Sequence, residues 1–290
     1  MRLRDVQRLE LPPTADMHVH LRQGKVMQLV ARQVLNGGVD TVFVMPNLQP
    51  PITTVAQALE YQSALRSIEP RVQYLMSLYL HPSITPQVIA EAAAAGITGV
   101  KMYPQGVTTN SESGVPADFL SAYSPVFAAM QEHDLVLNLH GEWPGPLPND
   151  DITLEEAFLP ELKKLHERFP RLRCVLEWQR LRPHALSSKT QAKPVPAGVF
   201  TQPFATQLVL LAFEEAIARG VLSDDQVTQD NLEGFLSRSA RRFYKVPDPS
   251  GVIVLERKGE RVPTSIKTEG GDVEIGLSKA GAEVFSLSWK

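Results

Sequence analysis

The sequence predicts an α/β fold, a (β/α)8 TIM barrel in which about six of the eight strands are present. Six short apolar segments follow one another, and helical segments separate most of them, which favours a parallel sheet. Polar residues recur at the ends of several strands, as barrel active sites require. A doubly wound sheet is the weaker alternative, because no glycine-rich phosphate turn follows the first strand.

The first half of the chain alternates regularly between strands and helices. A helix at residues 26–35 ends at the Asn-Gly-Gly sequence of residues 36–38, a typical stop signal. Residues 39–45 form a mostly apolar run, typical of a strand buried on both faces. Thr85 caps a later helix, and Gly96 ends it. The expected strands here are 16–21, 39–45, 72–80 and 97–103, and the expected helices are 26–35, 54–67 and 85–95.

The second half starts in the same way and then loses the alternation. Residues 153–156 read Thr-Leu-Glu-Glu, a capping box that opens a helix. Residues 178–196 contain neither a strand pattern nor a convincing helix, although two more barrel strands are needed before the next helix. The other expected elements are strands 135–140 and 173–177, helices 119–132, 153–169, 204–219 and 228–244, and a final strand at 285–289.

We expect residues 1–290 to form a single barrel domain. Its parts are the six strands in 1–177, an irregular junction at 178–196, C-terminal helices in 197–246 and a β-rich tail in 247–290.

The composition is typical of a soluble globular protein. The chain has 290 residues, 43% hydrophobic and 21% charged, with a net charge of −3, which argues against nucleic-acid binding. No apolar stretch approaches the roughly 18 residues of a membrane helix, and the N-terminus lacks an apolar segment of signal length. The single cysteine, Cys174, excludes an internal disulfide and favours a reducing compartment. We therefore expect a cytoplasmic protein with no nucleic-acid or membrane partner.

Two histidines lie two residues apart in the first predicted strand. Alternate side chains of a strand point the same way, so His18 and His20 share a face. Neutral imidazoles are common zinc ligands, although hydrogen bonds within a strand explain such a pair equally well. Arg22, two residues further on, falls on the same face and can hold a carboxylate in a bidentate fork.

Three more strand ends carry polar residues. Asn47 follows the second strand, Lys101 lies in the fourth and His140 ends the fifth. In a barrel these ends meet at one mouth. A lysine in an apolar strand must be paired, neutralised or modified, and a paired or snorkelling lysine is the ordinary interpretation. A carbamylated lysine is instead an anionic oxygen donor that can bridge two metals.

Five longer runs resemble the dihydroorotases, the amidohydrolases of pyrimidine biosynthesis, in their single-function form from fungi and many bacteria. They are DMHVHLR at 16–22, MPNLQPP at 45–51, GVKMYP at 99–104, GVTTNS at 106–111 and LNLHGE at 137–142. Residues 197–200 and the tail to 285–289 are similar to the fungal branch. The resemblance implies an amidohydrolase barrel and the reversible zinc-dependent cyclisation of N-carbamoyl-L-aspartate to L-dihydroorotate, a step towards UMP.

The resemblance also implies a role for each matching residue. His18 and His20 resemble ligands of a first zinc, Lys101 the carbamylated lysine that bridges two zinc ions, and His140 a ligand of the second. It implies two Zn²⁺ per subunit and a homodimer. The implied substrate-binding residues are Arg22 and Asn47 for the α-carboxylate, Thr108 and Thr109 on a closing loop, His184 for a carboxylate, and Ala197 for a backbone contact to the pyrimidine ring.

The chain departs from the family pattern after Glu177. The family has a zinc-binding histidine at the next position, where this chain has Trp178. The strand-seven segment with its pair of histidines is absent, and Arg180 stands where the catalytic aspartate would precede His184 by four residues. General acid–base groups contribute roughly 10²–10⁴ in rate, so we expect weakened zinc binding and little activity. Alternative splicing or a mispredicted gene would explain the missing segment of such a family member.

Two other functions remain open. The chain can instead be a non-catalytic truncated isoform or subunit. It can also be another cyclic amidohydrolase, with a hydantoin or allantoin as substrate. Arg22, Asn47 and the Thr108–Thr109 loop favour a small acidic substrate over that second alternative.

Overall fold

The computed structural model describes residues 1–107, 110–147, 149, 151–177 and 200–290. Two compact units divide the chain. The terminal unit comprises Met1–Val44, Gln62–Leu75 and Val199–Lys290, and the central unit comprises Met45–Tyr61 and Met76–Gly198. Within the described residues, no helix is long and apolar enough to cross a membrane.

The parallel strands are hydrogen-bonded in the order in which they occur along the chain, as the strands of a (β/α)8 barrel are. They are β2 (Thr14–Val19), β3 (Val39–Val44), β4 (Gln73–Tyr79), β5 (Gly99–Met102), β6 (Val136–His140) and β7 (Cys174–Glu177). Each overlaps a predicted strand, which confirms the prediction of an incomplete barrel with six strands. The described part of the chain contains no seventh or eighth parallel strand.

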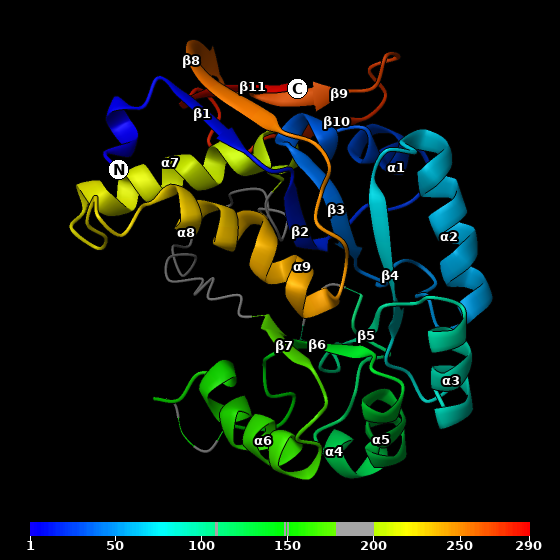
Figure 1. The fold of residues 1–290 in the computed structure, drawn as a ribbon. Helices are drawn as coiled ribbons and strands as arrows, with labels where there is room; N and C mark the ends of the chain where they lie inside the picture. Colours follow the sequence, from blue (N-terminus) through cyan, green and yellow to red (C-terminus); the bar gives the residue numbers. More distant parts are fainter. Residues whose placement is uncertain (108–109, 148, 150, 178–199) are drawn as a thin grey trace, which may run out of the picture. The chain divides into compact units, whose positions relative to one another are not determined.

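Helices follow most of these strands, and local signals set their ends. They are α1 (Gly24–Ala31), α2 (Val55–Ile68), α3 (Pro86–Ala94), α4 (Phe119–Ala122), α5 (Ser124–Glu132) and α6 (Leu154–Arg168). Thr153 and Glu156 form the predicted capping box of α6. In the central unit, α4, α5 and α6 lie on one side of β5, β6 and β7 (Figure 1).

The expectation of one helix over residues 119–132 is wrong. The chain forms α4 and α5 with a break at Tyr123, just before Pro125. Proline has no backbone N–H to continue the hydrogen-bond ladder, but it suits the first turn of a new helix. The expected helix at 228–244 is likewise divided into α8 (Gln229–Glu233), the π-helical turn η4 (Gly234–Arg238) and α9 (Ser239–Tyr244).

A small antiparallel sheet in the terminal unit is ordered β1-β8-β11. Its strands are β1 (Arg8–Leu11), β8 (Ile253–Arg261) and β11 (Glu283–Trp289), and β9 (Ser265–Lys267) pairs with β10 (Glu274–Gly276) nearby. Short 3-10 turns complete the unit at η1 (Leu3–Asp5), η2 (Leu35–Gly37) and η3 (Gln202–Phe204). Local sequence patterns do not predict β1, because pairing with the distant β8 makes this four-residue segment a strand.

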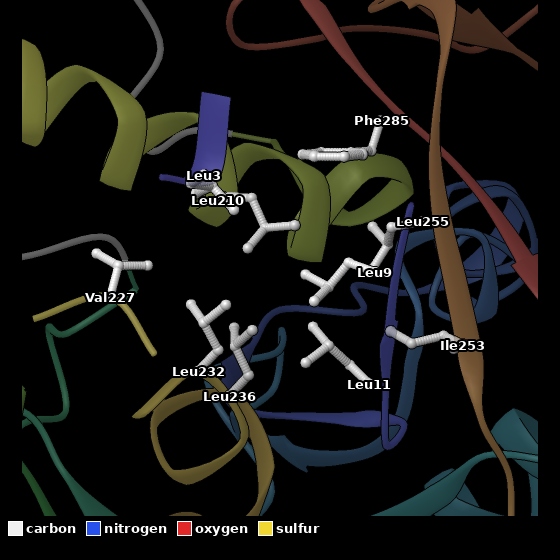
Figure 2. Close-up of a cluster of buried hydrophobic side chains, with 10 residues drawn as sticks. All are labelled: Leu3, Leu9, Leu11, Leu210, Val227, Leu232, Leu236, Ile253, Leu255 and Phe285. Carbon is white, nitrogen blue, oxygen red and sulfur yellow. The ribbon is translucent and has the colours of Figure 1, made fainter. Parts of the chain in front are cut away.

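Helix α7 (Ala205–Ala218) packs against this sheet (Figure 1). Figure 2 shows the core between them, to which α7 contributes Leu210. Alternate residues of β1, Leu9 and Leu11, point into this core, as do Leu255 and Phe285 from β8 and β11. The sheet therefore anchors the segment that leads directly into β2.

Candidate metal centre

The two histidines of the first parallel strand lie side by side. His18 is in β2 and His20 follows its last residue. Their Nε2 atoms are 3.3 Å apart. A tetrahedral zinc with Zn–N bonds of about 2.0–2.1 Å places two nitrogen ligands about 3.3–3.4 Å apart. The spacing of the pair therefore matches one edge of a zinc tetrahedron, and it is also compatible with a hydrogen bond between the rings.

Asp16 supports the backbone of this pair. The backbone N–H of His18 donates to Asp16 Oδ1 at 3.1 Å. Desolvation raises the pKa of Asp16 to about 6, although this hydrogen bond opposes the shift. Arg22 lies beyond the strand, because β2 ends at Val19, and its left-handed φ of 59° departs from the extended backbone that the expectation of a shared face assumes.

Lys101 lies fully buried in β5 of the central unit and is paired. Its ammonium group contacts Glu177 at the end of β7, and Asn138 Nδ2 donates to the other carboxylate oxygen at 2.7 Å. Lys101 Nζ also lies 5.1 Å from the centre of the Tyr103 ring. Burial holds the pKa of Lys101 well below its usual range, and the charge of Glu142 opposes this shift.

His140 lies close to this lysine site. The parallel register pairs His140 with Glu177 and Lys101 with Asn138. His140 Nδ1 contacts Glu142 Oε2, and both side chains are buried. A carboxylate on one ring nitrogen orients an imidazole and fixes its tautomer, the arrangement found behind metal-binding histidines.

Asn47 belongs to a second group of contacts in the central unit. Its carbonyl oxygen accepts a hydrogen bond from Asn110 Nδ2 at 3.1 Å. Gln49 Nε2 donates to Asn110 Oδ1 at 2.8 Å, and Tyr79 Oη donates to the Asn110 carbonyl oxygen at 3.3 Å. These bonds fix one end of the predicted closing loop against residues 47–49.

The predicted site residues are thus distributed over three parts of the chain. His18, His20 and Arg22 belong to the terminal unit, and Asn47, Lys101 and His140 to the central unit. Five other positions lie outside the described residues: Thr108, Thr109, Arg180, His184 and Ala197.

The histidine pair fits two ligand positions of a zinc ion, but the rest of a coordination shell is missing from the part of the chain that the structure describes. There, no group of three or more His, Cys, Asp or Glu side chains is placed to hold a metal. A structural zinc site uses four protein ligands, and a catalytic site uses three. The described residues therefore bring two candidate zinc ligands together without a complete coordination shell.

Sequence reasoning gave no role to four residues of the central unit: Asn138, Glu142, Glu177 and Asn110. For three of them, the position in the sequence could have indicated a place in the site. Asn138 alternates with His140 on β6, Glu142 follows it, and Glu177 ends a strand, where barrel sites gather their polar groups. The signal for Asn110 was weaker: asparagine is one of the residues that tolerate a left-handed backbone, and Asn110 has a φ of 57°.

A sheet of parallel strands in chain order, with an imidazole pair on the first and a buried lysine in the fourth, defines the class of metal-dependent amidohydrolases. No family model matches the chain. It is 38% identical to the probable dihydroorotase of Schizosaccharomyces pombe, across 90% of this chain and 94% of that protein. Identity to the Saccharomyces cerevisiae dihydroorotase is 34%, across 98% and 99%. The chain belongs to the dihydroorotase family.

Solved structures agree with this assignment. The crystal structure of the S. cerevisiae dihydroorotase in complex with 5-fluoroorotic acid is similar, with a TM-score of 0.85 and 33% identity over 98% of this chain and 99% of that one. A dihydroorotase from Campylobacter jejuni shares the fold, with a TM-score of 0.77 over 98% of this chain and 97% of that one.

The sequence alignment also reveals a difference in length. The alignment with the S. cerevisiae dihydroorotase extends over 372 positions, whereas this chain has 290 residues. At least 82 aligned positions, the difference between these numbers, therefore have no counterpart in this chain.

Proposed function

We propose that this chain carries part of a dihydroorotase active site and has little activity by itself. The reaction is the reversible, zinc-dependent cyclisation of N-carbamoyl-L-aspartate to L-dihydroorotate in pyrimidine biosynthesis. The observation that carries the proposal is the 3.3 Å spacing of the His18 and His20 Nε2 atoms, which suits a shared metal ion. Zinc, when bound, polarises a carbonyl group and makes water acidic enough to react near neutral pH.

The proposed ligands are His18 and His20 for one zinc, His140 for a second, and a carbamylated Lys101 between the two. Carbamylation requires a neutral amine, and the burial of Lys101 favours that form. The Lys101–Glu177 ion pair opposes it, because the ammonium must lose both its proton and its partner.

The proposed substrate-binding residues have side chains that suit a small dicarboxylate. Arg22 and Asn47 bind the α-carboxylate, and Thr108 and Thr109 cover the substrate. The bonds from Asn110 to residues 47 and 49 support this assignment, because they tie the end of that loop to the region of Asn47. His184 and Ala197 complete the proposed set.

The proposed loss of activity follows from the missing coordination shell. The described residues place no third metal-binding group near the histidine pair, and at least 82 aligned positions are absent. We assign these positions to barrel strands seven and eight, since the chain continues from Glu177 with Trp178 and carries Arg180 where an aspartate is expected. Without that aspartate the chain lacks both a ligand and a proton shuttle.

Zinc content and turnover, measured together on the purified chain, test the proposal. We expect clearly fewer than two zinc ions per chain after equilibration with zinc, and turnover of N-carbamoyl-L-aspartate at least 100-fold below that of the S. cerevisiae dihydroorotase, from the loss of acid–base catalysis. His18→Ala should remove the residual zinc. The matched control, His133→Ala, changes an exposed histidine and should leave zinc content unchanged.

Two results would contradict the proposal. Two tightly bound zinc ions with normal turnover would show that the site is complete, and zinc binding that survives His18→Ala would exclude the histidine pair. The second candidate function is that of a non-catalytic isoform or subunit. The incomplete coordination shell of the described residues favours it, and a chain with neither zinc nor turnover would support it.

The assembly and the location of the chain complete the proposal. A homodimer and a cytoplasmic location are the arrangements that we propose, the second on the basis of the single cysteine. Sedimentation velocity of the purified chain tests the first, and fractionation of cells that express it tests the second.

A further inference from the structure

A pocket of about 540 Å³ lies within the terminal unit. Phe213 of α7 forms one wall, and the continuous helical segment α8–η4–α9 forms the rest. None of its lining residues belongs to the candidate metal centre or to the proposed substrate contacts. Pockets of roughly 300–1,000 Å³ hold small organic molecules, so the size of this pocket suits such a ligand.

The apolar part of the pocket consists of two phenylalanine rings, and the rest of the lining, apart from Gly234, is polar. Phe235 is 66% exposed, and Phe213 packs against it with ring centroids 5.6 Å apart and ring planes at 77°. This edge-to-face contact restrains the Phe235 ring while leaving it open to solvent. A large exposed aromatic side chain at a pocket is typical of a surface that a ligand covers.

The Phe235 ring projects from the π-helical turn η4. Such turns are rare within helices and occur frequently at functional sites. Gly234 begins this turn, and a Cβ added there would first meet Ser239 Oγ, at 4.0 Å. The absence of a side chain at Gly234 therefore leaves room in the pocket beside the Ser239 hydroxyl.

The charged groups of the pocket are separated along the helical segment. Arg238 Nη1 donates to Glu233 Oε2 at 2.7 Å, and Nη2 contacts Asp230, so two carboxylates neutralise this guanidinium. Arg242 lies about 18 Å beyond Asp230 along the helix axis, at roughly 1.5 Å per residue. The exposed Arg242 side chain has no ion pair with any of the residues that the structure describes. One end of the pocket therefore presents an uncompensated positive charge.

Arg242 and Ser239 together can donate hydrogen bonds to an anion. They are three residues apart on α9, so their side chains are neighbours on one helix face, with Cβ atoms about 5–6 Å apart. Helical side chains lean towards the N-terminus, which directs Arg242 towards Ser239 and Phe235. A guanidinium can donate two parallel N–H bonds to a carboxylate, and the hydroxyl can donate a third bond.

We propose that this pocket binds a planar aromatic ring that carries one carboxylate group. The ring stacks on Phe235, and the carboxylate accepts hydrogen bonds from Arg242 and Ser239. A single uncompensated guanidinium matches one negative charge better than the nearly two charges of a phosphate monoester. The site is independent of the proposed function, because it shares no residue with the metal centre.

Three matched ligands test the recognition of ring and charge. Naphthoate has a planar ring and a carboxylate, naphthamide has the same ring without the charge, and decalin carboxylate has the charge on a puckered ring. We expect saturable one-to-one binding of naphthoate to the full chain, with a Kd below about 1 mM. The other two ligands should bind at least tenfold more weakly. Isothermal titration calorimetry measures all three.

Matched variants locate the binding site. Arg242→Gln should weaken naphthoate binding at least tenfold and abolish the preference over naphthamide. Arg66→Gln, at an exposed arginine outside the pocket lining, should change neither. Phe235→Leu should abolish the preference for naphthoate over decalin carboxylate, because leucine is apolar but has no flat face. Circular dichroism confirms that each variant is folded.

Four binding results would overturn the inference. They are no saturable binding of naphthoate to the folded chain, equal binding of naphthoate and naphthamide, equal losses in Arg242→Gln and Arg66→Gln, and tighter binding of adenosine monophosphate than of naphthoate. A dimer that Phe235→Leu abolishes would show that a second copy covers the ring, and would also overturn it. Loss of binding in His18→Ala would place the ligand at the metal centre instead. Zinc content and turnover are separate measurements, so failure of the proposed function remains distinguishable.

Discussion

Single residues show how the central unit accommodates charge in its interior. Lys101 is fully buried and contacts Glu177, which also accepts a hydrogen bond from Asn138. A lone buried ammonium would cost several kcal/mol, so the carboxylate is needed to keep the charged form of lysine in place. The same contact competes with the carbamylation proposed for Lys101.

Removing the partner of Lys101 should destabilise the fold. We expect Glu177→Gln to lower the free energy of unfolding by about 3–5 kcal/mol, because the buried Lys101 ammonium loses its carboxylate partner and must either stay charged alone or give up its proton. The matched control is Glu167→Gln, which breaks an exposed pair with Lys163 and should cost less than about 1 kcal/mol. Urea denaturation followed by circular dichroism measures both free energies of unfolding. Equal effects would show that the buried pair stabilises the fold no more than the exposed pair does.

Cys174 should react slowly in the folded chain. Burial raises the pKa of its thiol from 9.0 to about 11, and the thiolate is the reactive form. At pH 8 this shift lowers the thiolate fraction about 100-fold relative to the unfolded chain. The rate of labelling by a disulfide reagent, with and without denaturant, checks this. The rate in the folded state should still rise tenfold per pH unit up to pH 10, and a plateau below pH 9 would contradict the raised pKa.

At the level of elements, polar side chains connect helices to strands. Arg241 on α9 is buried, contacts Asp40 of β3 and donates to Thr41 Oγ1 at 3.0 Å and Ser237 Oγ at 2.9 Å. It also donates to the carbonyl oxygen of Pro13, just before β2. One side chain therefore ties α9 to the two strands that carry and flank the histidine pair.

The junction between η2 and η3 should not tolerate a larger residue. A Cβ at Gly37 would lie 2.1 Å from the backbone oxygen of Gln202 and 2.9 Å from the backbone nitrogen of Ala205. We expect Gly37→Ala to destabilise the chain by about 1–3 kcal/mol through overpacking. The matched change Gly234→Ala meets no atom closer than 4.0 Å and should be neutral or stabilising. Thermal denaturation compares the two, and a neutral Gly37→Ala would show that the backbones separate easily.

At the scale of the whole molecule, the described residues form a six-stranded parallel sheet in the strand order of the family's barrel. Six parallel strands lie in chain order, and the described residues supply two imidazoles at zinc-ligand spacing without a complete coordination shell. Barrel sites take ligands from the ends of several strands, so the loss of strands that we propose would remove ligands and pairing partners together.

Restoring the missing length should restore the site. We expect a chain in which residues 178–199 are replaced by the corresponding longer segment of the S. cerevisiae dihydroorotase to bind two zinc ions and to regain at least 100-fold in turnover. The same graft with His18→Ala is the control and should lose zinc. Zinc content and turnover are the measurements, and a folded graft that gains neither would show that the absent residues are not the cause.

Much of the fold was predictable from the sequence. Every predicted parallel strand from 16–21 to 173–177 overlaps a strand of the structure, and the capping box of α6 is confirmed. Period-2 and helical patterns, caps and glycine stops are local signals, so they can be recognised without knowing what packs against them. The family followed from short runs of residues at strand ends, for the same reason.

The tertiary structure decided what depends on residues far apart in the chain. Strand β1 exists because it pairs with β8, Lys101 is paired with Glu177, and Arg22 has a left-handed backbone conformation beyond the end of β2. The sequence by itself determined the order of elements and the family, because periodicity and motifs are properties of neighbouring residues. Strand pairing, burial and the pocket beside α7 arise only when distant segments meet, so the structure alone could show them.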